Sequence, residues 1–202
     1  MNRVAYNPKN GRLKTDASGV NVKRGFPAHL VIEAAQATAP NTAGIRAAAA
    51  STGSTSVFTT GITQPSVPRN ITATAGGTAA DIKAIQVIIE GTNFNDEVIT
   101  ETLPAFTAST AGTVTGIKAF KTVTKITIPA HTNTGATTAI GFGKKLGIPY
   151  KLPHNTVLFA ALDNVREATA PTVTNSATAI ENNTVDLNTA LNSKQVDVYL
   201  VV

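Results

Sequence analysis

Short segments of alternating or β-branched apolar residues recur along this chain, and turn-forming residues separate them at regular intervals. We expect strands over 70–74, 83–91 and 97–103, because each is bounded by Gly, Asn or Asp and alternates or is rich in Ile and Val. Four more are expected downstream, over 119–128, 138–143, 156–162 and 196–202. Almost no segment sustains a 3.6-residue period. The sequence therefore predicts an all-β fold, an antiparallel β-sandwich or related barrel, with an extended N-terminal arm.

Composition narrows the classes of function. The chain has no cysteine, which excludes disulfides, thiolate metal sites and thiol catalysis. Charged residues make up only 14%, compared with about 25% in typical domains, so a disordered polyelectrolyte is not expected. No apolar run approaches the roughly 20 residues of a membrane span, and the N-terminus lacks the apolar stretch of a secretory signal. We expect a soluble protein with no membrane partner.

The net charge of +5 comes from the N-terminus. Residues 1–24 hold six basic residues and one acidic residue, whereas residues 25–202 hold equal numbers of each. A basic segment on a neutral body is typical of an interaction tail with an acidic partner, and a solvated terminus is the alternative. A protein surface is a better partner than nucleic acid, because the segment lacks a dense Lys/Arg run and has one aromatic residue for stacking. The candidate binding residues are Arg3, Lys9, Arg12, Lys14, Lys23 and Arg24.

Proline and glycine divide the chain into three parts. Residues 1–27 form the basic extended arm, residues 28–64 a mixed segment or added strands, and residues 65–202 the β-sandwich body. The boundary lies in Gln64-Pro65-Ser66-Val67-Pro68, where each proline restricts itself and the residue before it to extended conformations. The four alanines at 47–50 can seed one marginal helical turn.

The titratable residues form no recognisable catalytic or metal-binding pattern. The three histidines lie far apart in sequence: His29, His131 and His154. None has a partner at the spacing of a metal ligand, so we expect hydrogen-bonded or surface histidines, with no metal and no cofactor. Glu97 and Glu101 share a strand face with Ile99, which predicts an exposed strand edge in preference to a cation or acid–base site.

The remaining motifs give no sign of enzymatic chemistry. Gly141-Phe142-Gly143-Lys144-Lys145 has neither the spacing of a phosphate-binding loop nor its trailing Ser or Thr, and is interpreted as the end of a strand. No Gly-x-Ser-x-Gly nucleophile motif is present, and the dispersed histidines give no reason to propose a triad. We do not expect an enzyme. Slim Thr and Ala side chains on strands lose little rotamer entropy when covered, which suits repeated protein contacts.

Several phrases of the body resemble a group of structural proteins of tailed bacteriophages, found among the head genes of phages and prophages of Gram-positive bacteria. The phrases are Pro68–Thr72, Ala80–Val87, Ile99–Phe106, Thr110–Val114, Lys118–Val123, Ile128–His131 and Ile140–Tyr150, and residues 165–202 fit as well. All of them are framework sequence without a catalytic role. The first 60 or so residues match nothing in this group.

The resemblance implies a non-enzymatic virion component, most specifically a decoration protein bound in many copies to the outside of the head. It would be made in the host cytoplasm, act on the capsid exterior and contact the major capsid protein. Many weak attachments give such a protein avidity, and a closed homo-oligomer is the usual form, with a trimer as our expectation.

Two other readings stay open. One is a tail or head–tail joining component, which would assemble into rings or tubes. The other is a host-surface or carbohydrate-binding module, since β-sandwiches commonly present ligands on loops. The absence of Trp and the presence of only three Tyr disfavour a sugar site, which usually uses aromatic platforms.

Overall fold

The computed structural model describes residues 25–202 and the backbone of three short strands before them, β1 (Ala5–Asn7), β2 (Arg12–Lys14) and β3 (Asn21–Lys23). In this part of the chain the only helical elements are two single 3-10 turns, and every strand pair with a defined register is antiparallel. The predicted antiparallel all-β fold is confirmed.

The largest sheet, sheet I, is built around the 12-residue strand β12 (Ala136–Gly147). β12 pairs with β7 along most of its length and also with β5 and β16. The sheet contains β5 (Asn41–Ala50), β7 (Arg69–Gly77), β10 (Gly112–Phe120), β15 (Thr172–Thr174) and β16 (Thr184–Asp186) in addition to β12.

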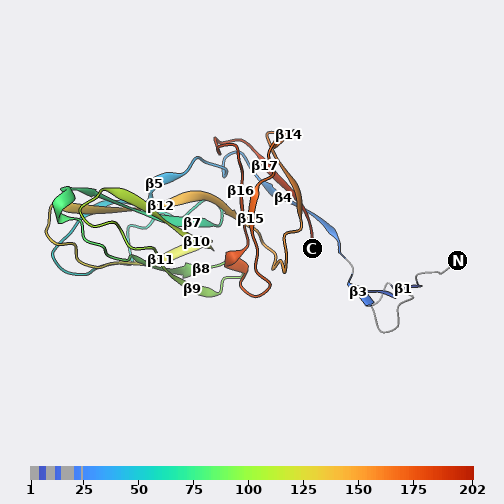
Figure 1. The fold of residues 1–202 in the computed structure, drawn as a ribbon, viewed down its shortest axis with the longest axis horizontal. Coiled ribbons are helices and arrows are strands. Elements are labelled where there is room, and N and C mark those ends of the chain that lie inside the picture. The colour runs from blue at the N-terminus through green and yellow to red at the C-terminus, as the bar shows by residue number, and fades with distance from the viewer. Residues whose placement is uncertain (1–4, 8–11, 15–20, 24) are drawn as a thin grey trace.

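A second layer, sheet II, packs against sheet I and completes a sandwich (Figure 1). It contains β6 (Ser56–Phe58), β8 (Ile88–Thr92), β9 (Val98–Thr102) and β11 (Thr122–Ile128). The first core lies between the two layers and includes fully buried Ile71, Ile89, Phe120 and Ile126. Alternation along these strands supplies its side chains, because successive residues face opposite sides of a sheet.

Sheet III lies at one end of the sandwich and encloses a second core (Figure 1). It has the order β14 (Val165–Arg166), β13 (Val157–Leu162), β17 (Val196–Val201) and β4 (Pro27–Ile32). Val198 and Leu200 of β17 pack there with Ile148, Leu152 and Val185. The apolar C-terminal strand is therefore interior to its sheet.

One strand contributes to both cores. Ile140 of β12 lies in the first core and Leu146 lies in the second. Between Phe142 and Leu146 the register with β7 shifts, so the strand changes its local pairing where it passes from one core to the other. The segment Gly141–Lys145, interpreted above as a strand end, is instead interior to a strand that continues to Gly147.

Residues 28–64 contribute a strand to each of the three sheets of the body, namely β4, β5 and β6. The expected helical turn at 47–50 is wrong, because these alanines belong to β5, where Ala49 and Ala50 oppose Thr138 and Thr137 of β12. A single helical turn has almost no cooperative support, whereas a strand at this place gains a ladder with β12.

The strand expected over 83–91 is shorter in the structure, because β8 begins only at Ile88. Ile85 and Val87 are nevertheless buried in the first core. Their carbonyl oxygens accept single hydrogen bonds from Phe106 N and Leu103 N. The alternation of this segment thus predicted that its apolar side chains are buried. It did not predict that residues 83–87 lack the continuous backbone hydrogen bonds of a strand.

Candidate functional site

The six basic residues predicted to bind a partner are only partly described by the structure. Three lie outside the described residues: Arg3, Lys9 and Arg24. Arg12 and Lys14 lie in β2 and Lys23 lies in β3, with Arg12 opposite Lys23 in the antiparallel register. β1, β2 and β3 pair with one another in that order and form a small meander, which we call the N-terminal meander.

The outer face of sheet III carries an aromatic ladder that the sequence did not reveal. His29, Tyr199 and Phe159 come from neighbouring strands β4, β17 and β13 and are opposite one another in register. Ring centroids are 4.3 Å apart for His29–Tyr199 and 4.5 Å apart for Phe159–Tyr199, and both pairs are stacked. The guanidinium of Arg166, from β14, lies 5.0 Å from the Phe159 centroid. The ladder therefore crosses all four strands of the sheet.

A buried acid fixes one end of this ladder. Asp197 is 4% exposed, and its Oδ1 lies 2.8 Å from His29 Nε2. Gln195 Nε2 donates to both carboxylate oxygens, at 3.2 and 3.1 Å. These contacts satisfy a carboxylate that would otherwise be costly to bury, and they hold the His29 ring parallel to Tyr199.

The ring geometry limits what this surface can bind. Inside the ladder each ring face is covered by the next ring or by Arg166, whereas a sugar platform needs an open aromatic face. Next to the ladder the outer face is open at Pro27 and at Val31, which is 39% exposed. The outer face is therefore firm and largely apolar, and its stacked aromatic side chains would lose little entropy on contact with another surface.

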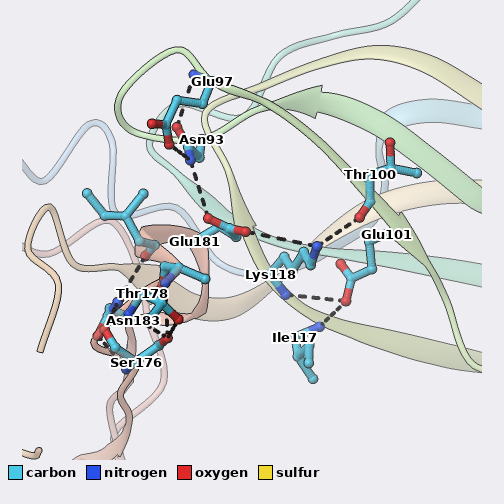
Figure 2. Close-up of polar contacts among 12 residues, drawn as sticks. Asn93, Glu97, Thr100, Glu101, Ile117, Lys118, Ser176, Thr178, Glu181 and Asn183 are labelled. Carbon is cyan, nitrogen blue, oxygen red and sulfur yellow. Dashed lines mark hydrogen bonds and ion pairs between the residues drawn. The ribbon is translucent and has the colours of Figure 1, made fainter. Parts of the chain in front are cut away.

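A polar network joins the sandwich to the turn that leads into β16 (Figure 2). Glu181, in the 3-10 turn η2 (Ile180–Asn182), accepts a hydrogen bond from Asn93 Nδ2 at 3.3 Å and lies 4.0 Å from Lys118 Nζ. Lys118 Nζ also donates to the carbonyl of Thr100 at 2.9 Å. These contacts hold η2 against β10 and against the turn between β8 and β9.

Asn183 is the anchor at the base of this turn (Figure 2). Its side chain is completely buried. Its Oδ1 accepts from Leu152 N and Ser176 N, and its Nδ2 donates to three carbonyl oxygens, including that of Ala179 at 2.9 Å. A buried amide with this many partners fixes the path of the surrounding loop.

The prediction of an exposed Glu97–Glu101 edge is wrong for Glu101. β9 is an edge strand, but Glu101 is only 7% exposed and lies on the buried face with Ile99. Its Oε1 accepts hydrogen bonds from Ile117 N at 2.7 Å and Lys118 N at 3.3 Å (Figure 2). Burial raises the pKa of the Glu101 carboxyl, and the two N–H groups counteract part of this shift. The carboxylate packs there because β10 has a bulge that directs both N–H groups toward it.

The histidines are not assembled into a metal site. His131 Nδ1 accepts from Lys83 N at 3.1 Å, so its Nε2 carries the proton and donates to Thr138 Oγ1 at 2.9 Å. Burial lowers the pKa of His131, which favours this neutral form. Within the described residues no group of three or more His, Cys, Asp and Glu side chains is placed to hold a metal ion.

An open groove of about 380 Å³ lies on the outer face of sheet I. Its lining includes Thr72, Thr115 and Phe142, together with an ion pair in which Lys144 Nζ lies 3.1 Å from Asp186 Oδ1. The residues that line this groove include no histidine and no nucleophile–base pair. Gly143 and Lys144 contribute to the groove as part of β12 and not as a phosphate-binding loop.

Comparisons of this protein with family models, with curated proteins and with solved structures find no match. In the described part of the chain, no helix is both long and apolar enough to cross a membrane.

The aromatic ladder is the feature of the site that sequence reasoning missed. Phe159 and Tyr199 lie in segments that were expected to be strands, at 156–162 and 196–202, and His29 lies in the mixed segment 28–64. Alternation predicts which residues share a face within one strand, but the register between strands separated by more than a hundred residues is not a local property. A weak signal for the ladder was present in the sequence. His29, Phe159 and Tyr199 each stand next to apolar residues of the second core, so alternation places their side chains on the opposite face of the strand.

Proposed function

We propose that this chain is a non-enzymatic structural protein of a tailed-phage virion, bound in many copies to the outside of the head as a decoration protein. The observation that carries the proposal is the concentration of the net charge in the basic N-terminal segment, which joins a neutral body at Gly25. Beside this junction the outer face of sheet III presents an aromatic ladder and open apolar residues, a surface suited to contact with another protein chain.

Two features support attachment to a large regular surface. The neutral body offers contacts through strands rich in Thr and Ala, and the basic segment offers attraction to an acidic shell of major capsid protein. Each such contact is weak alone, but a protein present at every lattice position gains avidity from an oligomer that binds several shell subunits at once. Residues 68–152, which carry most of the resemblance, form most of the sandwich. In this proposal the sandwich is a rigid support for the contact surfaces.

The direct test is co-sedimentation of the purified protein with tail-free heads of a matching phage, with the bound copies counted per head. We expect a number of copies proportional to the lattice. About a dozen copies, or none, would indicate a unique vertex, the tail or the head interior, and would overturn the decoration role.

The basic segment is tested separately by neutralising the three of its cations that lie in described strands. The triple variant Arg12→Gln, Lys14→Gln, Lys23→Gln should bind heads about tenfold more weakly, because ion pairs between two protein surfaces contribute from a few tenths of a kcal/mol to about 1 kcal/mol each. The matched control neutralises three exposed lysines of the body, Lys83, Lys151 and Lys194. Equal effects of the two triple variants would contradict a specific contribution from the N-terminal segment.

A further inference from the structure

Sheet III has one face in the second core, and within residues 25–202 no second layer covers its other face. Pro27, His29 and Val31 on β4 are exposed on this outer face, and the stacked row His29–Tyr199–Phe159 crosses three adjacent strands beside them. Sheets in stable sandwiches bury one such apolar face against another sheet about 10 Å away. The outer face of sheet III is therefore half of a sandwich.

The N-terminal meander has the complementary pattern. Tyr6 is opposite Leu13, and Leu13 is opposite Val22, so these three residues form one row across β1, β2 and β3. Because successive residues of a strand belong to opposite faces, Arg12, Lys14 and Lys23 belong to the other face of the meander. One face is thus apolar and the other basic.

A meander of three-residue strands cannot be stable on its own. A small sheet needs its apolar face covered by another layer before it gains independent stability. The two rows match in width, since each crosses three strands that lie about 4.8 Å apart. The apolar row of the meander and the aromatic row of sheet III can therefore cover one another.

The connection between them is too short for this contact within one molecule. Only residues 24 and 25 separate β3 from Phe26, which already exchanges hydrogen bonds with Val202 as an extension of β4. From residue 23 to residue 26 the extended chain spans about 10 Å, which equals the separation of packed sheets and leaves no length for a reversal.

Gly25 supports the same conclusion. A side chain there would meet Val201 Cγ1 at 2.5 Å, so the backbone at Gly25 lies flat against the end of β17. Gly25 is not among the described glycines with positive φ, which are Gly53, Gly61 and Gly77. At Gly25 the chain therefore still runs beside the end of β17, in line with the Phe26–Val202 hydrogen bonds that extend β4.

We propose that the N-terminal meander of one copy packs its apolar row on the outer face of sheet III of a second copy. Exchange of an identical element between protomers is an economical route to an oligomer, and a short connection favours it. In a symmetric assembly each copy gives one meander to a neighbour and receives one from another copy. The exchange then closes into a ring. The basic face of every meander then points away from the ring body. Only this last consequence, a row of cations free to meet the shell, rests on the proposed function.

The test measures the mass of the full-length protein in solution, without any capsid, by light scattering after size exclusion. The wild type should have the mass of two or more copies of the 20.8 kDa chain. Leu13→Lys on the apolar row, or deletion of residues 2–24, should shift it to the monomer. Asn21→Lys adds the same charge to the opposite face of the meander and should leave the oligomer intact.

The receiving surface is tested in the same way. Val31→Glu should also produce a monomer, whereas Val98→Glu, on the 81% exposed position of sheet II, should not. Mixing the Leu13→Lys and Val31→Glu variants should restore a species heavier than either, because the first retains an intact receiving face and the second an intact meander. Thermal melting followed by circular dichroism checks that Val31→Glu is folded. If this variant is unfolded, the masses of the Leu13→Lys and deletion variants show whether the meander is needed for the oligomer.

Three results would overturn the exchange: a monomeric wild type, equal masses for Leu13→Lys and Asn21→Lys, or no heavier species in the mixture when both parents are folded monomers. These results are independent of head binding. A monomer that decorates heads would contradict only the exchange, and an oligomer that ignores heads would contradict only the proposed function.

Discussion

The carboxylate of Glu101 is held through one of its oxygens only. Oε1 accepts two backbone hydrogen bonds, whereas Oε2 is buried without a partner and would lie against any side chain placed at Gly116. Burying a charged oxygen without a donor costs free energy, and this cost is the physical reason for the raised pKa of Glu101. The side chain fixes the bulge of β10 at the expense of some stability at neutral pH.

Replacement of this side chain by its neutral isostere tests that account. Glu101→Gln retains an acceptor for Ile117 N and Lys118 N but carries no charge, so it should raise the free energy of unfolding at pH 7 by about 1 kcal/mol. The pKa of Glu101 is higher in the folded state than in the unfolded state. The wild type therefore loses stability as the pH rises from the unfolded-state pKa through the folded-state pKa. The advantage of the variant should therefore shrink in acid.

Urea unfolding of both proteins at pH 4 and pH 7 gives the required difference. Glu33→Gln, at an exposed position, is the matched control and should show no such change between the two pH values. An advantage for Glu101→Gln that stays constant with pH, or a variant less stable than the wild type at pH 7, would contradict the account.

At the scale of elements, β12 depends on a close approach by β5. A side chain at Gly141 would overlap the carbonyl oxygen of Asn41 and the backbone of Thr42. These contacts are backbone atoms, which cannot move aside without shifting β5 away from the sheet. Glycine is thus needed at position 141 for reasons of packing and not of backbone conformation, since Gly141 has no positive φ.

We expect Gly141→Ala to lower the free energy of unfolding by about 2 kcal/mol, as overpacking of a tight site does. Gly112→Ala is the control, because a side chain there would meet nothing within 4 Å, and its effect should stay within about 0.5 kcal/mol. Urea midpoints of the two variants decide the matter. Similar midpoints would show that β5 accommodates the extra methyl group.

Local pattern predicted most of the strands and failed where pairing partners decide the outcome. β7, β9, β13 and β17 lie where alternation or apolar runs placed them. The alanines of β5 carry no strand signal and become a strand through pairing with β12. β15 and β16 are three residues each and rich in Thr and Asp, so their assignment to sheet I depends on the long-range contact with β12 and could not be read locally.

At the scale of the whole molecule, the two cores are not independent, because β12 supplies side chains to both and the network around Glu181 joins their ends. Alternation indicated which residues are buried, but it could not divide them between two cores, since this division depends on where sheet III packs. The aromatic ladder of the candidate site could not be predicted either, because it depends on which strands are neighbours in sheet III. The basic segment could be recognised from charge alone.

A large-to-small substitution in one core should therefore destabilise the other. Ile140→Ala, in the first core, should lower the free energy of unfolding by about 3 kcal/mol. The chain has no Trp, so in a Tyr6→Phe background the fluorescence comes from Tyr150 and Tyr199, which lie beside the second core and on sheet III. We expect the urea midpoint from this fluorescence to fall as far as the midpoint from far-ultraviolet circular dichroism.

The matched variant in the second core is Leu146→Ala, which should move both midpoints together as well. A fluorescence transition that Ile140→Ala leaves unchanged would show that the two cores unfold separately, contrary to the role assigned to β12.

The position of β17 has a consequence for synthesis of the protein. Its neighbours in sheet III are β13 and β4, and β4 begins only two residues after Gly25, so the sheet joins residues as far apart as His29 and Asp197, 168 positions along the chain. During translation β4 leaves the ribosome early and then waits without its partner. The second core, and with it the aromatic ladder, can be completed only after Val201 has emerged, so a nascent chain has no outer face of sheet III to offer to another copy while it is still being made.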